Sequence, residues 1–95
     1  MSLTVKNNIA ERRFEAQVDD YLAFVEYRLD GKQITFVHTE VPHQLGGQGV
    51  GGGIVKAALE FAKNNALQVV PECPFVARYI EGHQEYCHIV QRGLL

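Results

Sequence analysis

The densest concentration of one residue type lies at residues 46–53, GGQGVGGG, where six of eight residues are glycine. Glycine loses more backbone freedom on folding than any other residue, so the cluster indicates a specific requirement. The residues that follow, Ile54, Val55, Ala58 and Leu59, have the spacing of one helical face. The first N–H groups of a helix lack intrahelical partners, and the helix dipole is positive there. Bare backbone ahead of a helix therefore predicts an anion site, most naturally for a phosphate.

Three phosphate-binding devices use glycine-rich turns, and the sequence separates them. The nucleotide-hydrolase P-loop needs a Lys-Ser/Thr pair after its last glycine, where this chain has Val50 and Gly51. The dinucleotide pattern G-x-G-x-x-G fits Gly47, Gly49 and Gly52 by letter, but it belongs after the first strand of a longer βαβ fold. The third device, a site for the pyrophosphate of coenzyme A, is favoured. The alternative is a flexible glycine-rich turn that binds nothing.

The glycine segment resembles motif A of the GCN5-related N-acetyltransferase (GNAT) superfamily, R/Q-x-x-G-x-G/A followed by an apolar helix. More closely, HTEVP, GGQGVG, VVPECPFVARYI and HQEY together resemble the small, truncated, YjdJ-like branch of that superfamily. The resemblance runs from about Arg13 to Tyr86. It implies a pared-down acetyltransferase fold of the α/β class, with acetyl-CoA or coenzyme A as the ligand.

The motif can be placed in two registers. With its last glycine at Gly51, Gly46 stands where arginine or glutamine is usual, whereas a start at Gln44 misplaces the apolar residues of the helix. We prefer the first register, because backbone amides supply most pyrophosphate contacts in the superfamily. The pantetheine is then expected along the strand end before the loop. The residues that this implies for cofactor binding are Thr39, Glu40, Val41, Gly46, Gly47, Gln48, Gly49, Val50, Gly51 and Arg78.

Cys73 is the most suggestive residue for covalent chemistry. It lies between Pro71 and Pro74 at a predicted helix start, where a thiolate would be stabilised. The resemblance places it close to the acetyl group, so Cys73 is a candidate nucleophile that would form an acetyl-cysteine intermediate. A pocket-lining side chain and a buried, inert cysteine are the alternatives.

Direct transfer to an amine needs a base for the amine proton and an acid for the departing thiolate. Tyr79, in ARYIEGH, aligns loosely with a superfamily tyrosine that protonates the thiolate, and a core aromatic is the alternative. Glu40, His38 and His43 flank the expected pocket, and any of them could be the base. His38 alternates with Phe36 along the strand, which favours a hydrogen-bonded core histidine instead.

Two further groups of residues have weaker signals. The 3′-phosphate of the coenzyme could contact basic side chains on the helices, although these are usually just solvated: Lys56, Lys63, Arg78 and His83. A zinc site is not expected, because no C-x-x-C or H-x₃-H spacing joins the possible ligands, Cys73, His83, Cys87 and His88.

The elements that must position these residues form an antiparallel meander followed by a βαβ unit. Alternating apolar residues separated by turn signals predict three strands, at 14–18, 22–29 and 33–41. The helix after the glycines ends near Asn64-Asn65, and 67–70 is a short strand that should lie parallel to the third. A short helix is expected over 74–81, and 83–95 is either helical or irregular.

Length, net charge and the lack of long apolar runs limit the classes of partner that this chain is expected to have. With 95 residues, the chain is expected to form a single domain over 1–95. Its net charge of −2 argues against nucleic acid or an anionic membrane as the main partner. No apolar run approaches the roughly 20 residues of a membrane span. No signal peptide is visible, so a cytoplasmic protein with reduced cysteines is expected.

Two functions follow from these observations. The first is an N-acetyltransferase that moves acetyl from acetyl-CoA to an unidentified amine, either directly or through Cys73. The second is a coenzyme A-binding module with a sensing or scaffolding role and little turnover. The chain is expected to lack the helices that cover the acceptor side in the superfamily. An open side would suit a macromolecular acceptor, or a homodimer partner that completes the pocket.

Overall fold

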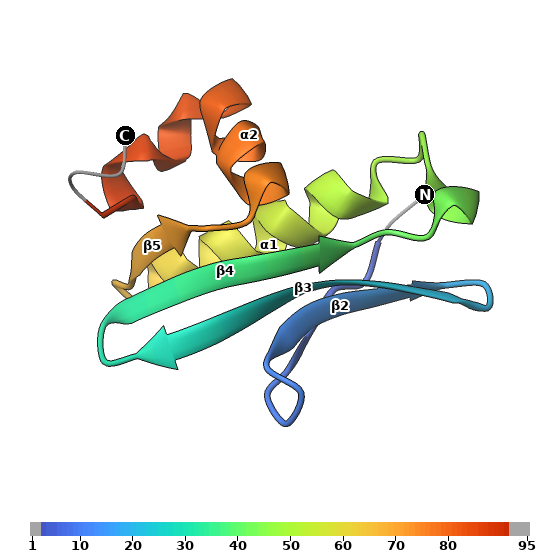
Figure 1. Ribbon diagram of the computed structural model, residues 1–95, viewed down its shortest axis with the longest axis horizontal. Helices are drawn as coiled ribbons and strands as arrows, with labels where there is room; N and C mark the ends of the chain where they lie inside the picture. The colour runs from blue at the N-terminus through green and yellow to red at the C-terminus, as the bar shows by residue number, and fades with distance from the viewer. Residues whose placement is uncertain (1–2, 92–95) are drawn as a thin grey trace.

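The computed structural model describes residues 3–91, which form one five-stranded sheet with helices packed against it (Figure 1). The strands are β1 (Lys6–Asn8), β2 (Arg13–Val18), β3 (Tyr21–Asp30), β4 (Gln33–Glu40) and β5 (Gln68–Pro71). The helices are α1 (Val50–Asn64) and α2 (Pro74–Gly82), with the short 3₁₀ segments η1 (His43–Leu45) and η2 (Gln84–Ile89). The predicted α/β arrangement is confirmed.

The strands lie in the order β1-β2-β3-β4-β5, so neighbours in sequence are neighbours in space. The pairs from β1 to β4 are antiparallel, and β5 is parallel to β4 with Ile34 opposite Val69. The crossover through α1 makes this parallel pair possible. The short strand β1 was not predicted, because its sequence, Lys-Asn-Asn, has little strand propensity. Pairing with β2 brings it into the sheet.

The helix α1 lies along one face of the sheet, and the core forms between them (Figure 1). Ile54 and Leu59 of α1 are fully buried with Ile34 and Phe36 of β4. At the far edge, the ring of Phe61 meets Phe14 of β2 edge-on, with the ring centroids 5.4 Å apart. The helix spacing in the sequence predicted this apolar face correctly.

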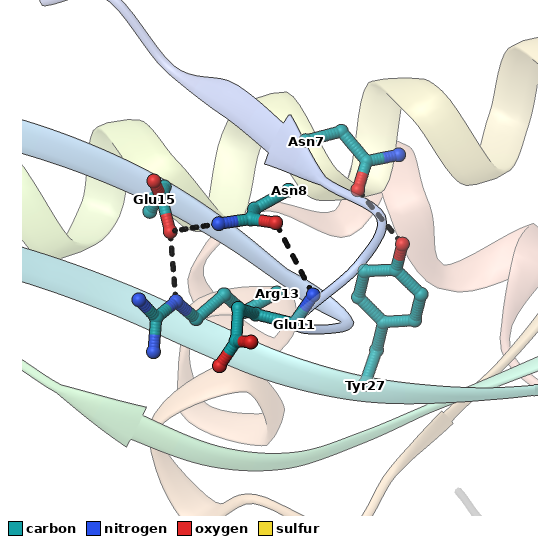
Figure 2. Close-up of polar contacts among 6 residues, drawn as sticks. All are labelled: Asn7, Asn8, Glu11, Arg13, Glu15 and Tyr27. Carbon is teal, nitrogen blue, oxygen red and sulfur yellow. Dashed lines mark hydrogen bonds and ion pairs between the residues drawn. The ribbon is translucent and has the colours of Figure 1, made fainter.

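The other face of the sheet carries a network of polar side chains that joins Asn8, Arg13 and Glu15 (Figure 2). Arg13 Nε donates to Glu15 Oε1 at 2.7 Å, and Asn8 Nδ2 donates to the same oxygen at 3.1 Å. The hydrogen bond from Arg13 is the main cause that lowers the pKa of Glu15. The Arg13 guanidinium also lies 4.8 Å from the centroid of the Phe24 ring. Polar and charged side chains thus cover this face and shield its aromatic ring, which suits contact with water.

A β-bulge in β4 decides which way the side chains of its second half point. Glu26 pairs with His38 and Tyr27 pairs with Phe36, so Val37 is an extra residue on β4. Beyond the bulge, Thr39 lies opposite the buried Val25 and therefore faces the core side.

His38 consequently lies on the polar face, where 54% of its side chain is exposed, and Nε2 donates to Glu40 Oε2 at 2.7 Å. The prediction of a core histidine at this position is wrong. It assumed unbroken alternation from Phe36, and the extra residue reverses that alternation.

The segment after β5 folds back over α1. Tyr86 of η2 is buried, and its hydroxyl donates to Glu60 Oε2 of α1 at 2.6 Å. Val90 then forms a parallel bridge with Val69, which extends the sheet beyond β5. For the stretch 83–95, residues 84–89 are thus 3₁₀ helix, and 92–95 lie outside the described residues. Within residues 3–91, neither helix is long and apolar enough to cross a membrane.

Candidate functional site

The glycine segment divides into a turn and the first turn of α1. Gly47 and Gly49 have positive φ angles of 79° and 75°, which side chains rarely allow, and Gly49 is the N-cap of α1. The helix begins at Val50, so Gly51 and the two glycines after it lie inside it. The expectation that all six glycines precede the helix is corrected.

The glycines inside α1 allow close packing. A Cβ on Gly51 would lie 2.7 Å from Cζ of Phe75 and 3.1 Å from Cγ2 of Val41. A Cβ on Gly53 would lie 2.6 Å from Cδ2 of Leu3. These distances are shorter than carbon contacts allow, so part of the glycine cluster serves packing against the start of α2 and the N-terminal segment.

The N-terminus of α1 nevertheless has the features of an anion site. Its first helical hydrogen bond joins Gly53 N–H to the Gly49 carbonyl at 3.0 Å. The N–H groups of Val50, Gly51 and Gly52 come before this bond and have no acceptor within the helix. No side chain caps this end, and its first turn carries no acidic residue. A cavity of about 240 Å³ lies in front of it, lined by Val41, Leu45, Gly46, Gly47, Gly49, Val50, Gly51, Gly52 and Phe75. The dipole and the free donors favour a phosphate here.

The sheet splits beside this cavity. Pairing between β4 and β5 ends at Phe36 and Pro71, and one more hydrogen bond follows, from Cys73 N–H to the Phe36 carbonyl at 2.9 Å. The chain then enters α2, while β4 continues to Glu40. In the described part of the chain, no strand pairs with the α2 side of β4 beyond Phe36.

Cys73 lies at this split. It is the N-cap of α2, only 4% exposed, and no side chain caps the helix in its place. Its sulfur lies 3.1 Å from the hydroxyl oxygen of Thr39, which reaches across from β4. Cys73, predicted as a candidate nucleophile, and Thr39, predicted as a cofactor-binding residue, are therefore in contact. The helix start predicted at Pro74 is confirmed.

Tyr79 lies six residues after Cys73, in the second turn of α2. Its ring packs over Gly52 and stacks on His83, with centroids 3.8 Å apart and planes 9° from parallel. His83 Nδ1 donates to the Tyr79 carbonyl at 2.8 Å, which fixes the stack. Burial raises the pKa of the Tyr79 hydroxyl, and the charges of Glu85 and Glu60 add to this effect. The phenol therefore ionises less readily than that of an exposed tyrosine, whose pKa is near 10.

Other predicted site residues lie apart from the cavity. The Glu40 side chain is on the polar face with His38, so only its backbone faces the split. Arg78 and Gln48 are exposed and do not line the cavity. Lys63 lies in the last turn of α1, at the end opposite the glycines.

Sequence reasoning missed Phe75 and Leu45, which line the cavity. The signal for Phe75 was its place directly after Cys73-Pro74, at a helix start next to the expected site. For metals, residues 3–91 contain no group of three or more His, Cys, Asp or Glu side chains that could hold an ion.

The fold and this site define an α/β protein of the GCN5-like kind. The structure is similar to the solution structure of a GCN5-like protein from Staphylococcus aureus, a candidate N-acetyltransferase, with a TM-score of 0.74 and 35% identity. The match covers 96% of this chain and 91% of the other. Residues 13–90 match the family described as GCN5-related N-acetyl-transferase. The chain belongs to this family of acetyltransferases, whose members generally use acetyl-CoA.

Proposed function

We propose that this protein transfers an acetyl group from acetyl-CoA to an amine, with Cys73 as the nucleophile that receives the acetyl group first. The observation that carries the proposal is the position of Cys73. Its sulfur lies at the start of α2, in the split beside β4, next to the cavity at the N-terminus of α1. The cavity expected to hold phosphate is lined by Phe75, two residues after Cys73. This arrangement suits a donor whose thioester is joined by a long chain to a phosphate group.

Two parts of this chain fit coenzyme A. The free N–H groups of Val50, Gly51 and Gly52 would hold its pyrophosphate, with Gly46 and Gly47 giving the backbone close access. The free edge of β4, from Val37 to Glu40, offers N–H and C=O groups to the amides of pantetheine, as a sheet edge does to an added strand. The acetyl thioester supplies the activated carbonyl group.

The proposed reaction needs a nucleophile and an acid, and two side chains supply them. Cys73 gives up its thiol proton to water and attacks the acetyl carbonyl as a thiolate, so the new S–C bond forms as the bond to the coenzyme sulfur breaks. Tyr79 of α2 gives its phenol proton to the leaving sulfur and regains a proton from water. The amine then attacks the acetyl group on Cys73, and the cysteine leaves as a thiolate.

The pair formed by His38 and Glu40 is not placed to serve the second step at Cys73. His38 Nε2 donates to Glu40 Oε2 on the polar face of the sheet, whereas the Cys73 sulfur lies on the other side, beside Thr39. In this proposal the proton that the amine loses passes to water. The acceptor is an amine on a small molecule or on a protein.

Intact mass spectrometry after incubation with acetyl-CoA tests the proposal, with Cys73→Ala as the variant and Cys87→Ser as the matched control. We expect a single acetyl adduct that forms in the wild type and in Cys87→Ser, is absent from Cys73→Ala, and is removed by hydroxylamine. Native spectra that retain coenzyme A without any adduct would favour direct transfer or the binding module. Retention of no coenzyme A would overturn the cofactor assignment.

A further inference from the structure

The contact between Thr39 and Cys73 depends on an irregularity of the sheet. Without the bulge at Val37, regular alternation from Phe36 would direct Thr39 to the polar face. The bulge instead places the Thr39 side chain on the side of α2, with its hydroxyl oxygen 3.1 Å from Cys73 Sγ. Bulges often redirect a side chain next to an active site. The local geometry thus brings a hydroxyl group to the one sulfur atom at the split.

Among the described residues, the contact given for the Thr39 hydroxyl group is the one with Cys73 Sγ. Cys73 uses its backbone N–H for Phe36 and its backbone carbonyl for Ala77, so the side chain contact with Thr39 is an additional link between β4 and α2. Cys73 is almost fully buried and Thr39 is half-buried, so water competes weakly for this contact. A hydroxyl group is the stronger donor of the two, and it can donate to a sulfur that has lost its proton.

We infer that Thr39 is a positioning residue for Cys73: its hydroxyl donates a hydrogen bond to the sulfur, which orients the thiolate and stabilises its charge. The inference rests on the proposed nucleophilic role of Cys73. When Cys73 attacks the acetyl carbonyl, its electron pair moves into the new S–C bond and the hydrogen bond from Thr39 weakens. When the amine takes the acetyl group, the electron pair returns to the sulfur and the hydrogen bond forms again.

Substitutions at Thr39 separate the effect of the hydroxyl from the effect of space. Thr39→Val keeps the volume and loses the hydroxyl, whereas Thr39→Ser keeps the hydroxyl and loses a methyl group. Both are made in a Cys87→Ser background, so that Cys73 is the single thiol. The rate of alkylation by iodoacetamide at neutral pH then reports the reactivity of Cys73, and it does so without acetyl-CoA.

We expect Thr39→Val to react about tenfold more slowly than the background protein and Thr39→Ser to react at nearly the background rate, because a hydrogen bond to a charged group is among the stronger ones. If access alone controlled the reaction, Thr39→Ser would react faster and Thr39→Val would be unchanged, and this order would overturn the inference. Thr39→Ala is a second variant without the hydroxyl, in case Thr39→Val does not fold.

The same variants are then treated with acetyl-CoA. We expect Thr39→Val to lower the maximal rate of adduct formation by a similar factor and to leave the half-saturating concentration of acetyl-CoA nearly unchanged. If Thr39→Val is alkylated more slowly than Thr39→Ser but the background protein forms no acetyl adduct, Thr39 positions the sulfur and the proposed acetyl transfer through Cys73 is wrong. Equal alkylation rates in Thr39→Val and Thr39→Ser would remove the positioning role, whatever acetyl-CoA does.

Discussion

The ring of Phe75 rests on the bare backbone of Gly51, so that the start of α2 packs directly onto the first turn of α1. An added Cβ at Gly51 would lie 2.7 Å from Cζ of this ring. We expect Gly51→Ala to lower the free energy of unfolding by about 1–2 kcal/mol, because the cost of overpacking exceeds the gain in helix propensity. Urea denaturation followed by circular dichroism measures this change.

Gly52→Ala is the matched control for that prediction. Its Cβ would lie 3.6 Å from the ring of Tyr79, which is an ordinary contact, so we expect unchanged or slightly higher stability. The double variant Gly51→Ala/Phe75→Ala should recover part of the loss, since removal of the ring makes room for the methyl group. Equal effects of Gly51→Ala and Gly52→Ala would show that the ring does not limit the helix start.

Tyr79→Phe tests whether the phenol is the acid for the leaving thiolate. Because the pKa of Tyr79 is raised, the phenol stays protonated through neutral pH and beyond its usual ionisation near pH 10. We expect the variant to form the acetyl adduct about 100-fold more slowly, with retention of coenzyme A unchanged in native spectra. Since phenylalanine keeps the stack on His83, an unchanged rate would assign Tyr79 to the core alone.

Tyr86 predicts how stability depends on alkaline pH. Burial and the hydrogen bond to Glu60 raise its pKa in the folded state, while in the unfolded chain a tyrosine ionises near pH 10. Its contribution is therefore fully present below about pH 10 and is lost as the pH rises above it.

Tyr86→Phe should make the loss of stability between about pH 10 and pH 11 less steep, and it should cost about 1–2 kcal/mol at neutral pH through the broken hydrogen bond. Urea denaturation at a series of pH values measures both effects. Tyr21→Phe, at the more exposed start of β3, is the control for the loss of a phenol. The same pH slope in wild type and Tyr86→Phe would contradict this account.

The C-terminus of α1 offers a stabilising substitution. Leu67 N–H bonds the Ala62 carbonyl at 2.9 Å and Ala66 N–H bonds the Lys63 carbonyl at 3.3 Å, a pattern that usually has glycine at the second donor. Ala66 has a φ of 54°, which costs energy for any residue with a Cβ. Ala66→Gly should raise the free energy of unfolding by about 0.5–1 kcal/mol. Ala57→Gly, inside the same helix, should lower it by about as much.

Much of the fold could be predicted because its signals are local. The alternation in β2 and β3, the turn at Asp30-Gly31 and the apolar face of α1 depend on residues close in sequence, and the structure agrees with each of them. The short strand β1 could not be predicted, because only its pairing with β2 makes it a strand. The 3₁₀ segment and the Val90 bridge likewise depend on contacts with α1 and β5.

The candidate site was predicted in parts, and tertiary structure decided how they combine. The sequence alone determined the glycine-rich helix start, the cysteine before Pro74 and the family, since these depend on residue type and order. Only the structure decided that an extra residue in β4 turns Thr39 toward Cys73 and His38 away from it. A bulge arises from pairing between two strands, and one strand's pattern does not contain it.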